Sequence, residues 1–166
     1  MSRPIEIRRI DYGDPRAVAI REAMDVEMGA LYEGFGDGMS DAMLADVDAA
    51  LVVHPEAMVA TVGAFDGDRL VGHAALRPAS IAGTDDALEV KRVIVLPEYR
   101  GQGISTRIMA ELESIARERG VGELVLQTGP RQLEAIALYE KLGYALIPNF
   151  GLYAPVDVFL CYGKSL

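Results

Sequence analysis

The 166-residue chain holds one cysteine, two histidines and no tryptophan. A single thiol, at Cys161, excludes an internal disulfide framework and a metal site built from several cysteines. His54 and His73 stand apart in the sequence, without the His, Asp or Glu spacing that a metal centre requires. The sequence therefore predicts a protein without a bound metal.

Long apolar runs are missing as well. No segment approaches the roughly 20 apolar residues that a membrane helix needs. The first eleven residues lack the apolar core of a signal peptide. Hydrophobic residues make up 51% of the chain and charged residues 25%, a mixture typical of globular proteins. We expect one domain over residues 3–166, located in the cytoplasm and off the membrane.

Positive charge is scarce. The chain has 16 Lys and Arg against 25 Asp and Glu, for a net charge of −9, which argues against a nucleic-acid partner. All of the excess lies in residues 1–86, which hold 16 acids and 7 bases, whereas residues 87–166 hold nine of each. A solvated surface accounts for these acids. The alternative hypothesis is an acidic mouth that attracts a cationic amine.

The most informative stretch is residues 93–107, VIVLPEYRGQGISTR. Here an apolar strand leads through a turn and two alternating glycines into a helix. Gly101 and Gly103 carry no Cβ, so their backbone can approach a ligand closely. The helix that follows directs its first free N–H groups and the positive end of its dipole at the same turn. With the permanent charge of Arg100 at the rim, the stretch predicts a pyrophosphate site.

Three interpretations of this site compete. A P-loop needs Lys and then Ser or Thr after its last glycine, but Ile104 follows Gly103. A dinucleotide fingerprint needs a glycine where Thr106 stands, and its acidic residue would be Glu123, which opens a strand instead of ending one. The third interpretation fits best. Arg-x-x-Gly-x-Ser at positions 100–105, behind V-x-P-x-Y, resembles the coenzyme A loop of the GNAT superfamily of N-acetyltransferases. Ser105 replaces the usual Gly or Ala.

A second block strengthens this resemblance. Residues 135–144, AIALYEKLGY, are similar to the GNAT segment A-x-x-L-Y-x-K-x-G-F/Y. Together the two blocks span residues 89–147, about a third of the chain. The resemblance implies an α/β (α+β) fold with a mixed, mostly antiparallel central sheet and helices on both faces. It also implies direct transfer of an acetyl group from acetyl-CoA to a primary amine of a small molecule or peptide.

The resemblance assigns roles to particular residues. The pyrophosphate loop would comprise Arg100, Gly101, Gln102, Gly103, Ile104, Ser105 and Thr106. The central strand would offer backbone groups to the pantetheine arm and the acetyl carbonyl from Val93, Ile94 and Val95. Tyr139 matches the tyrosine that protonates the coenzyme thiolate, and a phenol of ordinary pKa, about 10, is protonated at neutral pH. The alternative for Tyr139 is a core residue, because it lies on an apolar helical stripe.

The base is assigned to Glu89, which resembles a carboxylate that some members use to deprotonate the amine through water. Lys91 would share its face of the strand and keep it ionised. The alternative for Glu89 is a structural ion pair. Two positions depart from the family: Gln127 stands where some members have a glutamate, and Gln132 where many have an asparagine that contacts the coenzyme. Simple alternation over residues 88–96 would also put Val93 and Val95 on the face of Glu89.

Acceptor recognition is assigned to the first two helices and the loop between them, especially Tyr32 and Phe35, although aromatic residues at a helix end are also common in cores. Two other functions stay open: a non-catalytic acyl-CoA sensor and a dinucleotide-binding module. A homodimer through the tail strands is a further hypothesis. Periodicity and turn residues predict strands at 5–10, 57–65, 70–76, 88–96, 124–126 and within 153–163, and helices at 15–33, 41–51, 104–119 and 133–142.

Overall fold

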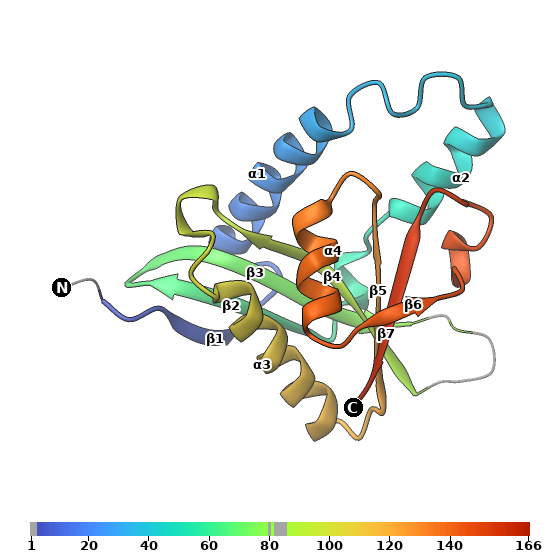
Figure 1. The fold of residues 1–166 in the computed structure, drawn as a ribbon. Coiled ribbons are helices and arrows are strands. Elements are labelled where there is room, and N and C mark those ends of the chain that lie inside the picture. The colour runs from blue at the N-terminus through green and yellow to red at the C-terminus, as the bar shows by residue number, and fades with distance from the viewer. Residues whose placement is uncertain (1–2, 80, 82–85) are drawn as a thin grey trace.

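The computed structural model describes residues 3–79, 81 and 86–166. Its strands form one seven-stranded sheet in the order β1-β2-β3-β4-β5-β7-β6 (Figure 1). The strands are β1 (Glu6–Ile10), β2 (Ala60–Asp66), β3 (Arg69–Pro78), β4 (Ala87–Val95), β5 (Glu123–Thr128), β6 (Ala145–Ile147) and β7 (Leu160–Ser165). β4 and β5 run parallel, and every other neighbouring pair is antiparallel. The expected mixed, mostly antiparallel sheet is confirmed.

Helices cover both faces of this sheet, as the resemblance implied (Figure 1). One face carries α1 (Pro15–Leu31) and α2 (Asp41–Leu51), and the other carries α3 (Ile104–Glu118) and α4 (Leu133–Lys141). Local chemistry fixes where the first two begin. The side chain of Asp14 accepts a hydrogen bond from the N–H of Arg16, and the side chain of Ser40 accepts one from the N–H of Met43. None of the helices in the described part of the chain is both long and apolar enough to cross a membrane.

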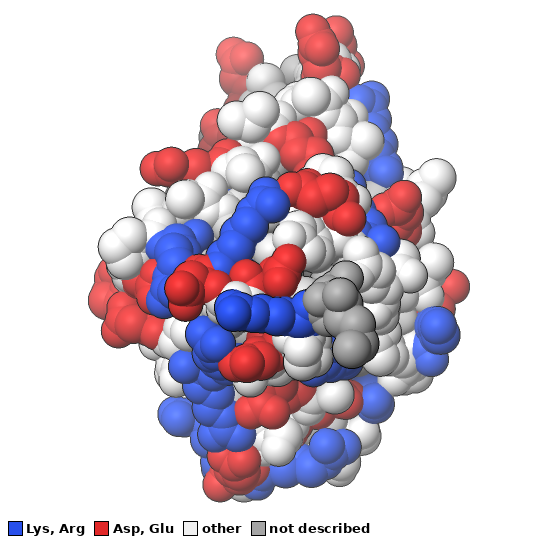
Figure 2. Space-filling model, turned by 90° about the vertical axis from the view of Figure 1, so that its left-hand side faces the viewer, with Lys and Arg blue, Asp and Glu red and all other residues white. Residues whose placement is uncertain are grey.

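Acidic and basic side chains are interspersed over much of the face that Figure 2 shows, with acidic ones predominant at its top. Ion pairs account for part of this mixing. Arg9 of β1 contacts Glu111 and Glu118 of α3, at 2.7 Å each. These pairs are exposed, so each contributes little stability. Their consequence is that the net charge of −9 is not spread as one continuous acidic field over this face.

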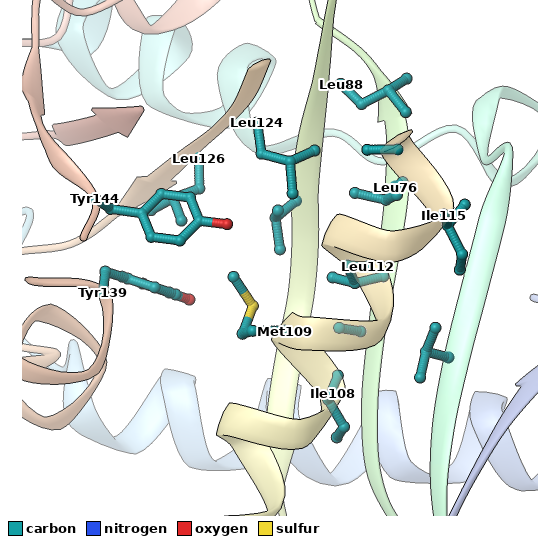
Figure 3. Close-up of a cluster of buried hydrophobic side chains, with 14 of the residues drawn as sticks. Leu76, Leu88, Ile108, Met109, Leu112, Ile115, Leu124, Leu126, Tyr139 and Tyr144 are labelled. Atoms are coloured by element: carbon teal, nitrogen blue, oxygen red, sulfur yellow. The ribbon is translucent and has the colours of Figure 1, made fainter. Parts of the chain in front are cut away.

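The largest core cluster lies between the sheet and the pair α3 and α4 (Figure 3). The predicted stripe of α3 is buried along its whole length: Ile104, Ile108, Leu112 and Ile115. It packs against strand residues that point to the same face, among them Leu76, Leu88 and Leu124. Burying a side chain of this size contributes roughly 1.5–3 kcal/mol. α3 is therefore held firmly, which fixes the position of its N-terminus.

A β-bulge interrupts β4 at Arg92. His73 lies opposite Ile94 and Ala75 opposite Lys91, so one residue of β3 faces two of β4. Arg92 has φ 58°, in the left-handed region. The bulge shifts the alternation of side chains by one residue. Val93 and Val95 therefore pack on the α3 side, against the cluster that holds Leu88 and Val90, and the expectation that they share the face of Glu89 is wrong.

β4 and β5 separate just before the bulge. They pair only from Ala87–Glu123 to Val90–Leu126. Within the described residues, β4 then continues with β3 alone and β5 with β7 alone. The backbone of β4 above Val90 therefore has no strand partner on its β5 side, which leaves an opening in the sheet.

The end of the chain differs from the prediction. β6 was not anticipated, because three residues are too few for a recognisable alternation. Tyr153 belongs to a 3-10 turn (Gly151–Tyr153) and not to a closing strand, which begins only at Leu160. The segment between β6 and β7 instead buries Phe150, Tyr153 and Val156 in a second cluster beneath α2.

Candidate active site

A groove of about 550 Å³ lies at the end of β4, between α1 and the N-terminal ends of α3 and α4. Its walls combine apolar side chains with a few charged ones. The lining residues are Met24, Glu27, Met28, Leu31, Val93, Ile94, Val95, Tyr99, Arg100, Gly101, Gly103, Ile104, Ser105, Arg131, Gln132, Leu133, Glu134, Ala135 and Leu138. Nine of the predicted coenzyme-binding residues are among them. Gln102 and Thr106 belong to the same loop and first helical turn but lie outside the groove wall.

The loop before α3 has the backbone geometry that a phosphate requires. Gly101 and Gly103 have φ of 75° and 74°, which other residues rarely adopt. Among the described residues, no atom lies within 4 Å of the position that a Cβ would occupy at either glycine. The first N–H that bonds within this helix end is that of Arg107, to the carbonyl of Gly103. The N–H groups of the first turn thus have no partner inside the helix and are free for an anion.

Arg100 lies at the rim of this groove, as expected, but its guanidinium has partners of its own. Nε donates to the carbonyl of Val95 at 2.9 Å, and Nη2 contacts Glu27 of α1 at 2.7 Å. The carboxylate of Glu27 raises the pKa of Arg100 above its ordinary value. The ion pair connects α1 to the loop before α3, and no sequence pattern indicated it.

A cluster around Tyr32 joins the end of α1 to the loop between β5 and α4. The Tyr32 hydroxyl donates to Oε1 of Gln132 at 3.3 Å and accepts from the N–H of Arg131 at 3.3 Å. It occupies the space that a Cβ on Gly129 would need. Arg131 donates to the carbonyls of Leu31 and Glu33. We call Tyr32, Gly129, Arg131 and Gln132 the α1 clasp.

The α1 clasp bears on two predictions. Gln132 lines the groove, and its Oε1 also accepts from the N–H of Gly129 at 3.0 Å, so its amide is held in one orientation. The rings of Tyr32 and Phe35 meet edge to face and are both covered by the guanidinium of Arg131. These rings, expected to recognise an acceptor, thus already contact a cation of the protein itself.

Tyr139 is buried, with 5% of its surface exposed, and belongs to the core cluster. Its ring contacts those of Tyr144 and Tyr162, with centroids 6.0 and 6.4 Å away, and Figure 3 shows it directed toward Met109. Ala135 and Leu138 of the same helix line the groove. Burial raises the pKa of Tyr139 above its ordinary value, which keeps the phenol protonated. This position of Tyr139 is compatible with both roles: a structural core residue and a proton donor next to the groove.

Glu89 lies in a buried polar cluster. Its Oε2 accepts from Nε of Arg77 at 2.9 Å, and its Oε1 accepts from the Tyr153 hydroxyl at 2.5 Å. The expected contact with Lys91 is present, with Nζ 3.7 Å from Oε1. Burial lowers the pKa of Lys91 and raises that of Tyr153 from their ordinary values. Arg77 and Tyr153 carry no sequence signal for this site, because they come from β3 and from the 3-10 turn, far from Glu89 in the chain.

This cluster forms the polar part of a second cavity, of about 390 Å³, beside the end of α2. Most of its walls are apolar. The lining residues are Ala49, Ala50, Val52, His54, Arg77, Pro78, Glu89, Phe150, Gly151, Leu152 and Tyr153. We refer to it as the α2 cavity.

His73 supports the bulge of β4 from the α1 side of the sheet. Its Nε2 lies 3.0 Å from Nη1 of Arg21, which can only donate, so Nε2 accepts. Nδ1 therefore carries the proton and donates to the carbonyl of Arg92 at 2.8 Å. Burial, as the main cause, lowers the pKa of His73 to about 4, so the ring is neutral. No sequence pattern pointed to this role.

Three comparisons with known proteins bear on this geometry. The family model described as "Acetyltransferase (GNAT) family" matches residues 20–144. An IAA acetyltransferase from Azospirillum brasilense is 42% identical over 78 residues, which are 47% of this chain and 51% of that protein. The chain thus spans about half the length of the curated relatives it matches.

The solved structures agree on the fold. A protein from Klebsiella pneumoniae subsp. pneumoniae MGH 78578, described as an acyl-CoA N-acyltransferase, superposes with a TM-score of 0.75 at 26% identity. The match covers 98% of this chain and 97% of that one. The PaiA N-acetyltransferase of Thermoplasma acidophilum, solved with coenzyme A, superposes with a TM-score of 0.67 at 18% identity, over 99% and 100% of the two chains.

Proposed function

The chain belongs to the GNAT family of acetyltransferases, and we propose that it transfers the acetyl group of acetyl-CoA to a primary amine of a small molecule or peptide. The observation that carries this proposal is the groove at the end of β4. It combines two left-handed glycines before the N-terminus of α3 with an opening in the sheet and apolar walls.

The residues of the groove fit coenzyme A. The first N–H groups of α3, together with Gly101, Gly103 and Ser105, would hold the pyrophosphate. Backbone groups of Val93, Ile94 and Val95 would hydrogen-bond the pantetheine arm along the edge that β5 leaves free. When bound, acetyl-CoA supplies the thioester carbonyl carbon that the amine attacks.

Two residues of the chain would then carry out the proton transfers of this reaction. The amine nitrogen forms a bond to the carbonyl carbon, and the bond from that carbon to sulfur breaks. Tyr139 donates its phenolic proton to the departing sulfur. Glu89, whose oxygens are already hydrogen-bonded by Arg77 and Tyr153, accepts the proton that the amine loses through a relay of waters along β4.

A non-catalytic acyl-CoA sensor is the second candidate. The burial of Tyr139 and the ion pairs of Glu89 favour it, since both side chains have structural partners. A sensor and an enzyme share the coenzyme site and differ in turnover.

Calorimetric titration of the full chain with acetyl-CoA tests the coenzyme site, with NAD and ATP as controls. We expect saturable binding of acetyl-CoA alone. Screening amines for thiol release then separates the enzyme from the sensor. If NAD binds and acetyl-CoA does not, the assignment of the loop is wrong, and the proposed acetyl transfer is wrong as well.

A further inference from the structure

The polar cluster around Glu89 contains two bases and one acid. Arg77 and Glu89 line the α2 cavity, and Lys91 lies outside its lining, with Nζ 2.9 Å from the Tyr153 hydroxyl. Arg77 and Lys91 both contact Glu89, at 2.9 and 3.7 Å. Within the described part of the chain, no second carboxylate forms an ion pair with either cation. With both bases charged, the cluster therefore carries an excess of one positive charge, in a protein whose net charge is −9.

This excess charge is removed from water. The side chains of Arg77 and Lys91 are 15% and 8% exposed, and that of Glu89 is 4% exposed. A buried charge without a counter-ion is costly, because the low-dielectric interior does not solvate it. Burial already lowers the pKa of Lys91. An anion bound in the cavity would act as the missing counter-ion and remove this cost. The cavity should therefore bind an anionic ligand in preference to a neutral one.

Arg77 has donors left for such an anion. Nε donates to Glu89, Nη1 to the carbonyl of Val52 at 3.3 Å and Nη2 to the Tyr153 hydroxyl at 3.1 Å. A guanidinium has five N–H donors, so two have no acceptor among the residues that the structure describes. Arg77 lines the cavity, where a carboxylate could meet them.

We propose that the α2 cavity binds a carboxylate of the acceptor, so that the substrate class is amines that carry a carboxylate at a distance. The inference rests on the proposed function, because the amine must reach the thioester. The acceptor would run from the α2 side of the sheet, which Glu89 faces, to the groove that Val93 lines. The two residues are four positions apart on β4, with the bulge at Arg92 between them, and a strand rises about 3.3 Å per residue. The amine and the carboxylate are thus separated by on the order of 10 Å, as in an ω-amino acid of medium length or a short peptide with a free C-terminus.

Matched substrates test this proposal in the full chain. The probes are γ-aminobutyrate, ε-aminocaproate and ω-aminocaprylate, each compared with its own amide, with thiol release as the readout. We expect kcat/KM for the acid to exceed that for the amide by about 10-fold or more in the longer pairs. Arg77→Gln should bring the ratio near one, and Arg8→Gln, a change at a half-buried position on β1, should leave it as in the wild type. Equal rates for acids and amides in the wild type would overturn the proposal.

Two further measurements keep the test independent of turnover and of folding. Calorimetry with caproate and caproamide measures the anion site directly; we expect caproate to bind more tightly, and equal binding would overturn the proposal. Leu152→Glu places an acid at the wall of the cavity on a residue that is 64% exposed, so the fold should persist. It should lower the preference for acids. If caproate binds selectively but no amine is acetylated, the anion site stands and the proposed acetyl transfer is wrong.

Discussion

At the scale of single residues, Tyr139 and Tyr144 form a matched pair of buried phenols in one cluster. If Tyr139 protonates the thiolate, Tyr139→Phe should lower kcat by about 100-fold, because general acids contribute on that order. The KM for acetyl-CoA should change little, because the ring stays in place. Steady-state kinetics with thiol detection measure both.

Tyr144→Phe is the control for this substitution. The hydroxyl of Tyr144 is buried and has no hydrogen-bond partner among the residues that the structure describes. Its removal should leave kcat unchanged and stability equal or higher. Wild-type turnover in Tyr139→Phe would rule out Tyr139 as the general acid.

The lowered pKa of the buried His73 imidazole leads to a prediction of how stability depends on pH. Its pKa is about 4 in the folded protein against an ordinary 6.5, so the unfolded chain binds the additional proton first as the pH falls. The free energy of unfolding should therefore decrease between pH 6.5 and 4, by at most about 3 kcal/mol from this ring. The cations facing it, Arg21 and Arg92, oppose its protonation in the folded state.

Urea denaturation from about pH 7 to about pH 4 measures this effect. In His73→Gln the part of the pH dependence that this ring causes should be absent, whatever the stability at neutral pH. Parallel curves for the two proteins would contradict the assigned neutral, buried imidazole.

Residues with a local signal were the ones that the sequence could predict. The glycines before α3 and the buried stripe of that helix follow from spacing and backbone chemistry alone. Arg77, Tyr153 and His73 could not be found this way, because their partners lie 12 to 64 residues away along the chain. The contacts of each of these side chains depend on strand register and on a turn that no sequence pattern predicts.

At the scale of elements, the two ends of α3 offer a controlled comparison. Gly103 and Gly120 have φ of 74° and 72°, and at neither does an atom of the described part of the chain lie within 4 Å of the place that a Cβ would take. Alanine at either should cost roughly 1–2 kcal/mol of stability through the left-handed backbone. Only Gly103→Ala places a methyl group at the proposed phosphate site, so only it should weaken acetyl-CoA binding, by about 10-fold or more. Equal affinities in calorimetry would contradict the pyrophosphate assignment.

The α1 clasp predicts a second paired comparison. Gly129→Ala should displace the Tyr32 hydroxyl, lower stability by about 1–3 kcal/mol and raise the KM for acetyl-CoA, because Gln132 loses a partner. A Cβ at Gly29, on the helix that carries Tyr32 at its end, would meet no atom within 4 Å in the part of the chain that the structure describes. Gly29→Ala should therefore gain up to about 1 kcal/mol. Thermal melting and kinetics of the two variants check this. An unchanged KM in Gly129→Ala would separate the clasp from the groove.

Elements were predicted well where the pattern was long. The helices and β1 to β5 have the expected positions within a few residues. β6 and the bulge of β4 were missed for a shared reason. Both depend on contacts with other strands, and simple alternation over residues 88–96 carries no sign that Arg92 adopts φ 58°.

At the scale of the whole molecule, the excess of acids in residues 1–86 leads to a prediction about salt. If they attract a protonated amine, the KM of a cationic acceptor should rise several-fold between low salt and about 0.5 M salt, since exposed charges are screened. The kinetics should be measured beside an uncharged amine of low basicity, whose KM should stay constant. A KM of the cationic acceptor that does not change with salt concentration would contradict the hypothesis that the acids attract the amine. The homodimer through the tail strands stays a prediction.

The bulge at Arg92 also matters for how the proposed activity could be re-engineered. Because the alternation of β4 changes there, positions 89 and 91 face the α2 side, and positions 93 and 95 face the α3 side. A library randomised on the α2 side, at Val52 and Leu152 of the α2 cavity, would sample new acceptors without altering Glu89 or the wall of the coenzyme groove. Directed evolution, or natural divergence among gene copies, can therefore change what is acetylated independently of what supplies the acetyl group.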